Sequence, residues 1–157
     1  MQDLSEPGFP EPDGGKAPQM PFIVWNDRLS VGVGVLDEDH KRLVGVLNDL
    51  YDAIRAGRGK ETLGRLLDQL ADYTLFHFRR EEEFFAQTGY AGAVDHKAEH
   101  DNFAAWITKL RTRYVEGTAA APSLEVINYL KDWLFDHILG SDQLYGPHLN
   151  EMGIQKM

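Results

Sequence analysis

Seven side chains that can bind metal ions recur along this chain of 157 residues, and five of them are histidines. Imidazole and carboxylate groups together suit transition-metal ions such as iron, zinc and manganese. The set is large enough to hold two ions and to leave one coordination position open for a small molecule. The seven residues are His40, His77, Glu81, His96, His100, His137 and Asp142.

Two pairs within this set have the spacing of ligands on one helix. His77 and Glu81 are four residues apart, as are His96 and His100, so each pair would project from one helix face. Taken alone, a His-x-x-x-Glu pair is typical of an exposed helix, and a single histidine is typical of a satisfied core residue. All seven together would place five imidazoles and two carboxylates in one region, which is costly without a cation.

Apolar residues at intervals of three and four predict the helices that position these ligands. In the first helix Leu43, Leu47 and Leu50 form such a stripe, and His40 continues it. The predicted helices run from an N-cap at Asp37 to Gly57, from about Lys60 to Gln87, from about Ala93 to Glu116, and onward from an N-cap at Ser123.

Short connections between these helices predict an all-α, up-down-up-down antiparallel four-helix bundle. His40 lies near the start of the first helix, and His77 with Glu81 near the end of the second. The third helix begins with its two histidines, and the fourth ends near His137. Alternating helix direction therefore predicts that all these ligands meet at one end of the bundle.

His137 and Asp142 require a departure from regular helix. Residues five apart point about 140° away from each other on an α-helix. A wide turn or a helix end would bring Asp142 round to the other ligands, and Gly140 makes such a change inexpensive.

The two ends of the chain differ from the predicted helical region. Residues 1–20 are rich in proline, glycine and acidic residues, which predicts a disordered tail. Residues 21–146 form the predicted domain, which begins with an extended N-terminal arm because glycines interrupt its apolar residues. Residues 147–157 are predicted to form a C-terminal tail, in which His148 is a surface histidine.

Composition narrows the classes of partner. A net charge of -9 argues against nucleic acid, which requires a clustered basic surface. The sequence has no run of about 20 apolar residues and no secretory signal, so we expect a cytoplasmic protein with no membrane partner. It also has no cysteine, so a metal must be bound through nitrogen and oxygen.

Four motifs carry a resemblance to the hemerythrin family over about residues 22–146. They are DEDHKRL around His40, HFRRE at His77–Glu81, HKAEH at His96–His100 and HILGSD at His137–Asp142. The resemblance implies two iron ions, one bound by the last three histidines and the other by the first two. It further implies that both carboxylates, together with an oxide or hydroxide, bridge the ions.

Counting donors then leaves one open position, on the ion with two histidines, where O2 could bind. Leu134, Ile138 and Trp133 are expected to close an apolar shell over it. We therefore expect an oxygen-binding protein that serves in transport, storage or sensing and is not an enzyme. We expect it to be a monomer or a weak oligomer. No motif in the sequence identifies a protein partner.

Three alternatives stay open at this stage. A di-iron oxidase, a peroxidase or a nitric oxide-reducing enzyme could use the same open position. The string from His96 to His100 also reads as an inverted zinc-peptidase motif with Glu99 as general base. Finally, the chain could be a structural or interaction bundle with incidental histidines.

Overall fold

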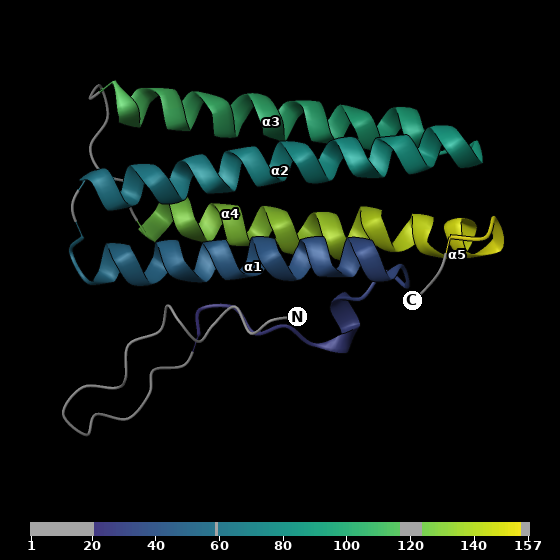
Figure 1. Cartoon of the computed structure of the whole chain (residues 1–157), viewed down its shortest axis with the longest axis horizontal. Coiled ribbons are helices and arrows are strands. Elements are labelled where there is room, and N and C mark those ends of the chain that lie inside the picture. Colours follow the sequence, from purple (N-terminus) through teal and green to yellow (C-terminus); the bar gives the residue numbers. More distant parts are fainter. Residues whose placement is uncertain (1–20, 59, 117–123, 155–157) are drawn as a thin grey trace.

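A computed structural model describes residues 21–58, 60–116 and 124–154, and within these residues all regular structure is helical. Four long helices lie side by side and alternate in direction, as expected for an antiparallel four-helix bundle (Figure 1). None of the helices described is long and apolar enough to cross a membrane. The elements are η2 (Asp27–Leu29), α1 (Gly34–Arg55), α2 (Lys60–Thr88), α3 (Ala93–Val115), α4 (Leu124–Asp136), η3 (His137–Asp142) and α5 (Gln143–Glu151).

The start of α1 differs from the sequence-based prediction. The helix begins at Gly34, so Asp37 lies in its first turn and is not the N-cap. The Asp37 carboxylate instead accepts hydrogen bonds from the Ser30 hydroxyl at 2.6 Å and from the Val31 N–H at 2.8 Å. This acidic side chain therefore ties the preceding arm to the helix. The predicted N-cap at Ser123 lies outside the described residues.

The apolar stripes of the four helices meet in one core. Leu36, Leu47 and Leu50 of α1 are among its fully buried side chains, and Ile107 and Ile127 bring α3 and α4 into it. Burial of these side chains is the main favourable contribution to folding. Toward one end of the bundle the same inward positions carry polar groups.

The chain widens into a π-helix, η3, between His137 and Asp142. The N–H of Gln143 bonds to the carbonyl of Ile138, five residues back, where a regular α-helix would use the residue four back. The expectation of a wide turn around Gly140 is confirmed. The extra residue in this turn brings Asp142 to the same side as His137.

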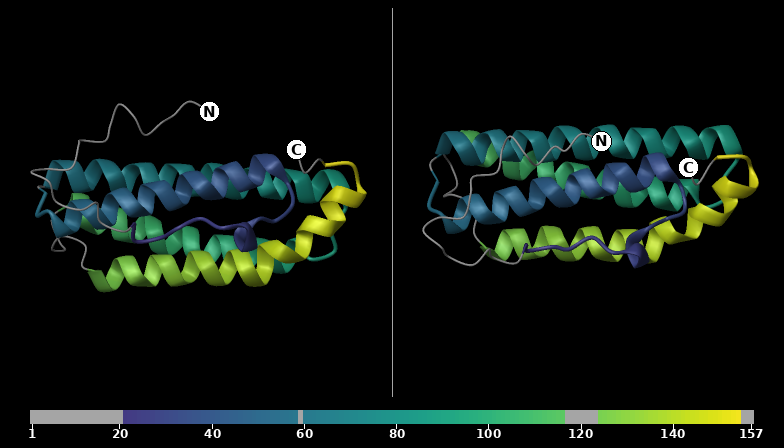
Figure 2. Two further views of the ribbon diagram at one scale, coloured as in Figure 1. Left: turned by 90° about the horizontal axis from the view of Figure 1, so that it is seen from below. Right: turned by 60° about the horizontal axis from the view of Figure 1, so that its bottom comes forward.

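Helix α5 continues to Glu151, beyond the domain boundary expected at residue 146. Leu149 is fully buried, and the ring Nε2 of His148 is 3.0 Å from the carbonyl oxygen of Thr88. Residues 147–151 therefore pack as part of the bundle because a buried leucine fixes them. Figure 2 shows α5 turning across the end of the bundle.

The arm that precedes α1 runs alongside α1 and α4 (Figure 2). The Gln143 side chain donates to the carbonyl groups of Arg28 and Ser30, and the Asn48 side chain exchanges two hydrogen bonds with the backbone of Ile23. Gly146 lies directly against the arm, where a larger residue would not fit. The arm is therefore held by both the first and the last helix.

Replacing Gly146 with alanine should destabilise the protein. An added Cβ would lie 2.1 Å from the carbonyl oxygen of Val31, so the arm must move. We expect a loss of about 1–3 kcal/mol in the free energy of unfolding, measured by urea denaturation. Gly140→Ala is the matched control, because no atom lies within 4 Å of its Cβ position. Equal effects of the two substitutions would contradict this account of the arm.

Candidate metal centre

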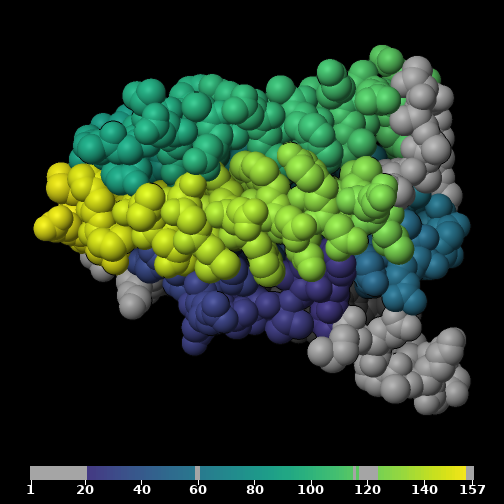
Figure 3. Space-filling view, turned by 180° about the vertical axis from the view of Figure 1, so that it is seen from behind, coloured from purple at the N-terminus to yellow at the C-terminus, as the bar shows by residue number. Residues whose placement is uncertain are grey.

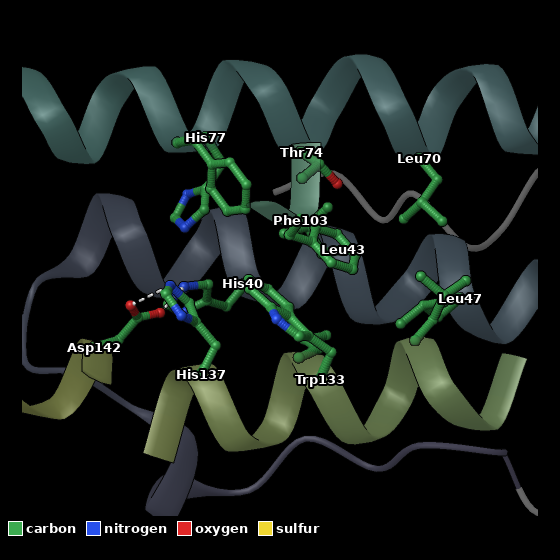
Figure 4. Close-up of a pocket in the computed structure, with 13 residues that line it drawn as sticks. His40, Leu43, Leu47, Leu70, Thr74, His77, Phe103, Trp133, His137 and Asp142 are labelled. Carbon is green, nitrogen blue, oxygen red and sulfur yellow. Dashed lines mark ion pairs between the residues drawn. The ribbon is translucent and has the colours of Figure 1, made fainter. Parts of the chain in front are cut away.

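All seven predicted ligands meet at one end of the bundle, and each is at most 5 % exposed. His40 comes from α1, His77 and Glu81 from α2, and the next two histidines from α3. His137 and Asp142 come from the two ends of η3. Figure 4 shows His40, His77, His137 and Asp142 converging from three sides.

The two carboxylates divide the five histidines into two groups. Glu81 turns its Oε1 toward Nε2 of His100, at 2.9 Å, and of His96, at 3.5 Å. Its Oε2 faces Nε2 of His77, at 3.1 Å, and of His40, at 3.8 Å. Each oxygen of the Glu81 carboxylate therefore faces a different group of histidines.

Asp142 makes the same division from the opposite side. Its Oδ1 lies 3.0 Å from Nε2 of His96 and 3.1 Å from Nε2 of His137. Its Oδ2 lies 3.0 Å from Nε2 of His40. We call His96, His100 and His137 the three-histidine group, and His40 and His77 the two-histidine group. Both carboxylates therefore lie between the two groups, with one oxygen turned toward each.

These close approaches are not hydrogen bonds. Nine buried side-chain atoms of the centre have no hydrogen-bond partner, which is costly in a folded protein. Two donors bound at right angles to one ion, each at roughly 2.1 Å, lie about 3 Å apart, close to most of these separations. Eight of the nine atoms therefore fit metal ligation, and they are Nε2 of all five histidines, Oε1 of Glu81 and both carboxylate oxygens of Asp142. The ninth is Nδ1 of His40, which does not face the two carboxylates.

A second set of carboxylates orients three of the histidines through Nδ1. Asp39 lies 2.9 Å from Nδ1 of His77, Glu82 lies 2.8 Å from that of His100, and Glu99 lies 2.8 Å from that of His137. A proton held on Nδ1 leaves Nε2 free to bind a metal ion. These three acids are called the outer carboxylates.

The roles of the outer carboxylates were not predicted from the sequence, although a signal was present. Each lies directly beside a ligand in the sequence. Neighbouring residues on a helix point in different directions, so each outer carboxylate can reach a histidine on another helical segment. Asp39 of α1 reaches α2, Glu82 of α2 reaches α3, and Glu99 of α3 reaches η3.

Several known proteins are similar to this chain. Residues 31–149 match the family model described as the hemerythrin HHE cation binding domain. The chain belongs to the hemerythrin family. A bacteriohemerythrin of Stenotrophomonas maltophilia is 35% identical over 136 residues, which cover 84% of this chain and 87% of the relative. One from Methylococcus capsulatus is 34% identical, with 83% of this chain and 99% of the relative covered.

Solved structures agree with this assignment. The crystal structure of a wild-type hemerythrin matches with a TM-score of 0.77 at 33% sequence identity. The match covers 82% of this chain and 98% of the hemerythrin. The fold of the bundle is therefore that of the hemerythrin family.

Three further side chains fix acidic groups of this hemerythrin-family centre. Arg80 binds both oxygens of Asp39, with its Nε at 3.1 Å and its Nη2 at 3.0 Å, and the Tyr73 hydroxyl donates to the same carboxylate at 2.9 Å. The hydroxyl of the fully buried Tyr145 donates to Oε2 of Glu81. Burial raises the pKa of Asp39, but His77, Arg80 and Tyr73 outweigh it and lower that pKa.

In the metal-free centre the pKa values of the histidines and the carboxylates depend strongly on one another. Burial lowers the pKa of His77, but the Glu81 and Asp39 carboxylates outweigh it and raise that pKa to about 10. For His96 burial is likewise outweighed, here by Asp142 and Glu81, and its pKa rises to about 9. Burial raises the pKa values of Glu81 and Asp142, yet the surrounding histidines leave both lowered. Metal binding must therefore displace protons.

A small cavity adjoins the centre. About 20 Å³ is open to the centre of a water-sized molecule, which is enough for one small ligand. Trp133 and Leu134 line the cavity as expected, whereas Ile138 is fully buried but lies outside the lining. Both members of the two-histidine group line it, and His137 is the one member of the three-histidine group that does. The remaining lining residues are Leu43, Leu47, Leu70, Thr74, Phe78, Phe103, Leu130 and Asp142 (Figure 4).

The metal-free protein should lose stability as the pH rises. The pKa values of His77 and His96 are raised from 6.5 to about 10 and about 9, so protonation stabilises the folded state fully below 6.5. That stabilisation is lost as the pH passes through both raised values. We expect the melting temperature to fall between about pH 7 and about pH 10. Metal-loaded protein in the same buffers is the control, and an equal fall there would contradict the explanation.

Replacing Asp39 with asparagine should weaken metal binding. The change removes the charge that holds His77 and leaves the seven ligands in place. We expect affinity for a divalent ion to fall about 10–100-fold, measured by competition with a chelator. Glu38→Gln is the matched control, because Glu38 is exposed and pairs with Lys41 at 3.4 Å. An unchanged affinity in Asp39→Asn would show that this outer carboxylate has no influence on the metal.

Proposed function

We propose that the seven residues hold two iron ions and that this protein binds O2 reversibly. Reversible O2 binding is the function that the resemblance to hemerythrins implies. The observation that carries the proposal is the cavity, which is mostly apolar and adjoins both members of the two-histidine group. Iron held by these residues would supply the electrons that O2 needs for reversible binding.

Counting donors supports the location of the open position. The three-histidine group and one oxygen from each bridging carboxylate provide five donors, whereas the two-histidine group provides four. A shared oxide or hydroxide raises these to six and five. An octahedral ion would take six donors, so the open position would fall on the ion that His40 and His77 would hold.

The surrounding residues protect and orient that position. Leu43, Phe103 and Leu134 contribute apolar surface to the cavity, which excludes water and so disfavours loss of oxidised iron or of a charged oxygen species. Asp39 fixes the orientation of His77 beside the cavity, and Tyr145 fixes Glu81 between the two groups. The protein thus prepares a rigid, dry site for a small neutral ligand.

The peptidase alternative is not supported by the position of Glu99. Its carboxylate is occupied by Nδ1 of His137 at 2.8 Å and by the Ser141 hydroxyl at 2.7 Å. A general base must instead reach a water on the metal ion. The Glu99 side chain orients a ligand, which is the role of an outer carboxylate.

An oxygen-binding spectrum tests the proposal. Anaerobic loading should give two iron ions per chain by metal analysis. Admission of O2 should then produce a visible charge-transfer band that disappears on deoxygenation and returns over repeated cycles. Irreversible oxidation without the band would overturn reversible binding and favour the oxidase or peroxidase alternative.

Substitution of His77 tests the ligand assignment. His77→Ala removes one of the two imidazoles of the two-histidine group, so iron content should fall below two per chain and the O2 band should be lost. His148→Ala is the control, because His148 bonds to the Thr88 carbonyl outside the cluster. Full iron content in His77→Ala, or equal loss in both variants, would rule out the proposed ligand set.

A further inference from the structure

A continuous row of aromatic rings runs from a proposed iron ligand to the protein surface. Trp133 stacks on His137, with ring centroids 4.5 Å apart and an interplanar angle of 14°. Phe103 stacks on Trp133 at 4.0 Å, and Trp106 lies 5.8 Å beyond Phe103. Tyr129 ends the row, 4.6 Å from Trp106. These five rings are called the aromatic stack.

Helix geometry aligns the stack. Tyr129, Trp133 and His137 are spaced four residues apart, so they follow one another along a single face. Phe103 and Trp106 reach into this row from α3. Figure 3 shows the face of the molecule on which the surfaces of α3 and α4 meet.

The chemistry of the stack changes from its inner to its outer end. His137 and Phe103 are buried, Trp133 and Trp106 are partly buried, and Tyr129 is 47% exposed. Tryptophan and tyrosine are the aromatic side chains that most readily give up an electron, and this chain has no cysteine to compete with them. An exposed tyrosine can also release its phenolic proton to solvent when it is oxidised.

We propose that the aromatic stack carries electrons from donors in solution to the metal centre when hydrogen peroxide is the oxidant. The inference rests on the proposed iron occupancy. Electrons enter at Tyr129 and pass inward through Trp106 and Trp133, with Phe103 bridging the two indoles. The donor is a small one-electron reductant of the ascorbate class.

The reaction balances in electrons and atoms. Hydrogen peroxide takes up two electrons and two protons, its O–O bond breaks, and two water molecules leave. When the iron pair is already oxidised, both electrons come from Tyr129 in two successive steps, and each step releases one phenolic proton. Two donor molecules each return one electron and one proton to the tyrosine. The net reaction consumes one peroxide and oxidises two donors by one electron each.

A second group of aromatic rings is a less suitable electron route between the metal centre and the surface. Tyr145 lies 5.6 Å from His96, and Tyr90 lies 6.4 Å from Tyr145, measured between ring centroids. Tyr145 is fully buried, and its hydroxyl proton is held by Glu81. Tyr145 therefore cannot release this proton directly to solvent, whereas the exposed Tyr129 can.

Residue-resolved oxidation tests the proposal on the full chain loaded with iron. The oxidised protein is mixed with hydrogen peroxide, with and without ascorbate. Radicals are then followed by electron paramagnetic resonance, and oxidised residues by peptide mass spectrometry. We expect oxidation to concentrate at Tyr129 and Trp106, and ascorbate to suppress it. Metal-free protein treated in the same way should lack this pattern.

Two substitutions interrupt the route without touching the ligands or the cavity. Trp106→Phe keeps an aromatic ring but removes the oxidisable indole, so oxidation of Tyr129 should be lost and damage to Trp133 should increase. Tyr129→Phe, at an exposed position, should abolish the tyrosyl signal and leave folding intact. The controls are Trp25→Phe and Tyr51→Phe, because neither residue contacts the stack in the described structure. Both controls should retain the wild-type pattern.

The outcomes separate this inference from the proposed function. Iron content and the reversible O2 band are measured first on every variant. If the unmodified chain lacks them, the proposed function and this inference both fail. If they are intact but Tyr129 is oxidised equally in Trp106→Phe, or if oxidation appears at Tyr90 instead, only the electron route is overturned.

Discussion

The structure depends on two carboxylates buried among five imidazoles at one end of the bundle. Glu81 and Asp142 are fully buried, and most of the atoms that face each other there have no hydrogen-bond partner. Such an arrangement is stable only when cations satisfy it, as protons on the histidines or as metal ions. The bundle brings the groups together, and the groups in turn determine what the bundle can bind.

The outer carboxylates make this centre a link between helices. Asp39, Glu82 and Glu99 each orient a histidine on the next helical segment, so the three contacts run in sequence from α1 to η3. A ligand's orientation is thus set by a helix other than its own. Relative movement of two helices would disturb both the contacts of a histidine with Glu81 or Asp142 and its contact with an outer carboxylate. This double attachment explains how a site assembled from separate segments keeps its geometry.

The bundle and the convergence of the seven predicted ligands could be predicted from the sequence. Both follow from the helical period of the apolar residues and from the alternating direction of the helices. The π-helix was also accessible, since His137 and Asp142 cannot share a face of a regular α-helix. Details that depend on contacts between distant segments were not accessible. They include the attachment of Asp37 to the arm, the burial of Leu149 in α5, and the position of Ile138 outside the cavity lining.

The π-helix joins the metal centre to the start of the chain. Asp142 ends η3, and the next residue, Gln143, holds the arm through the carbonyl groups of Arg28 and Ser30. Any shift that relaxes the wide turn toward a regular helix would rotate Asp142 out of the centre and carry Gln143 away from the arm. The inserted residue therefore fixes two contacts at once, because the turn that places Asp142 in the centre also places Gln143 against the arm.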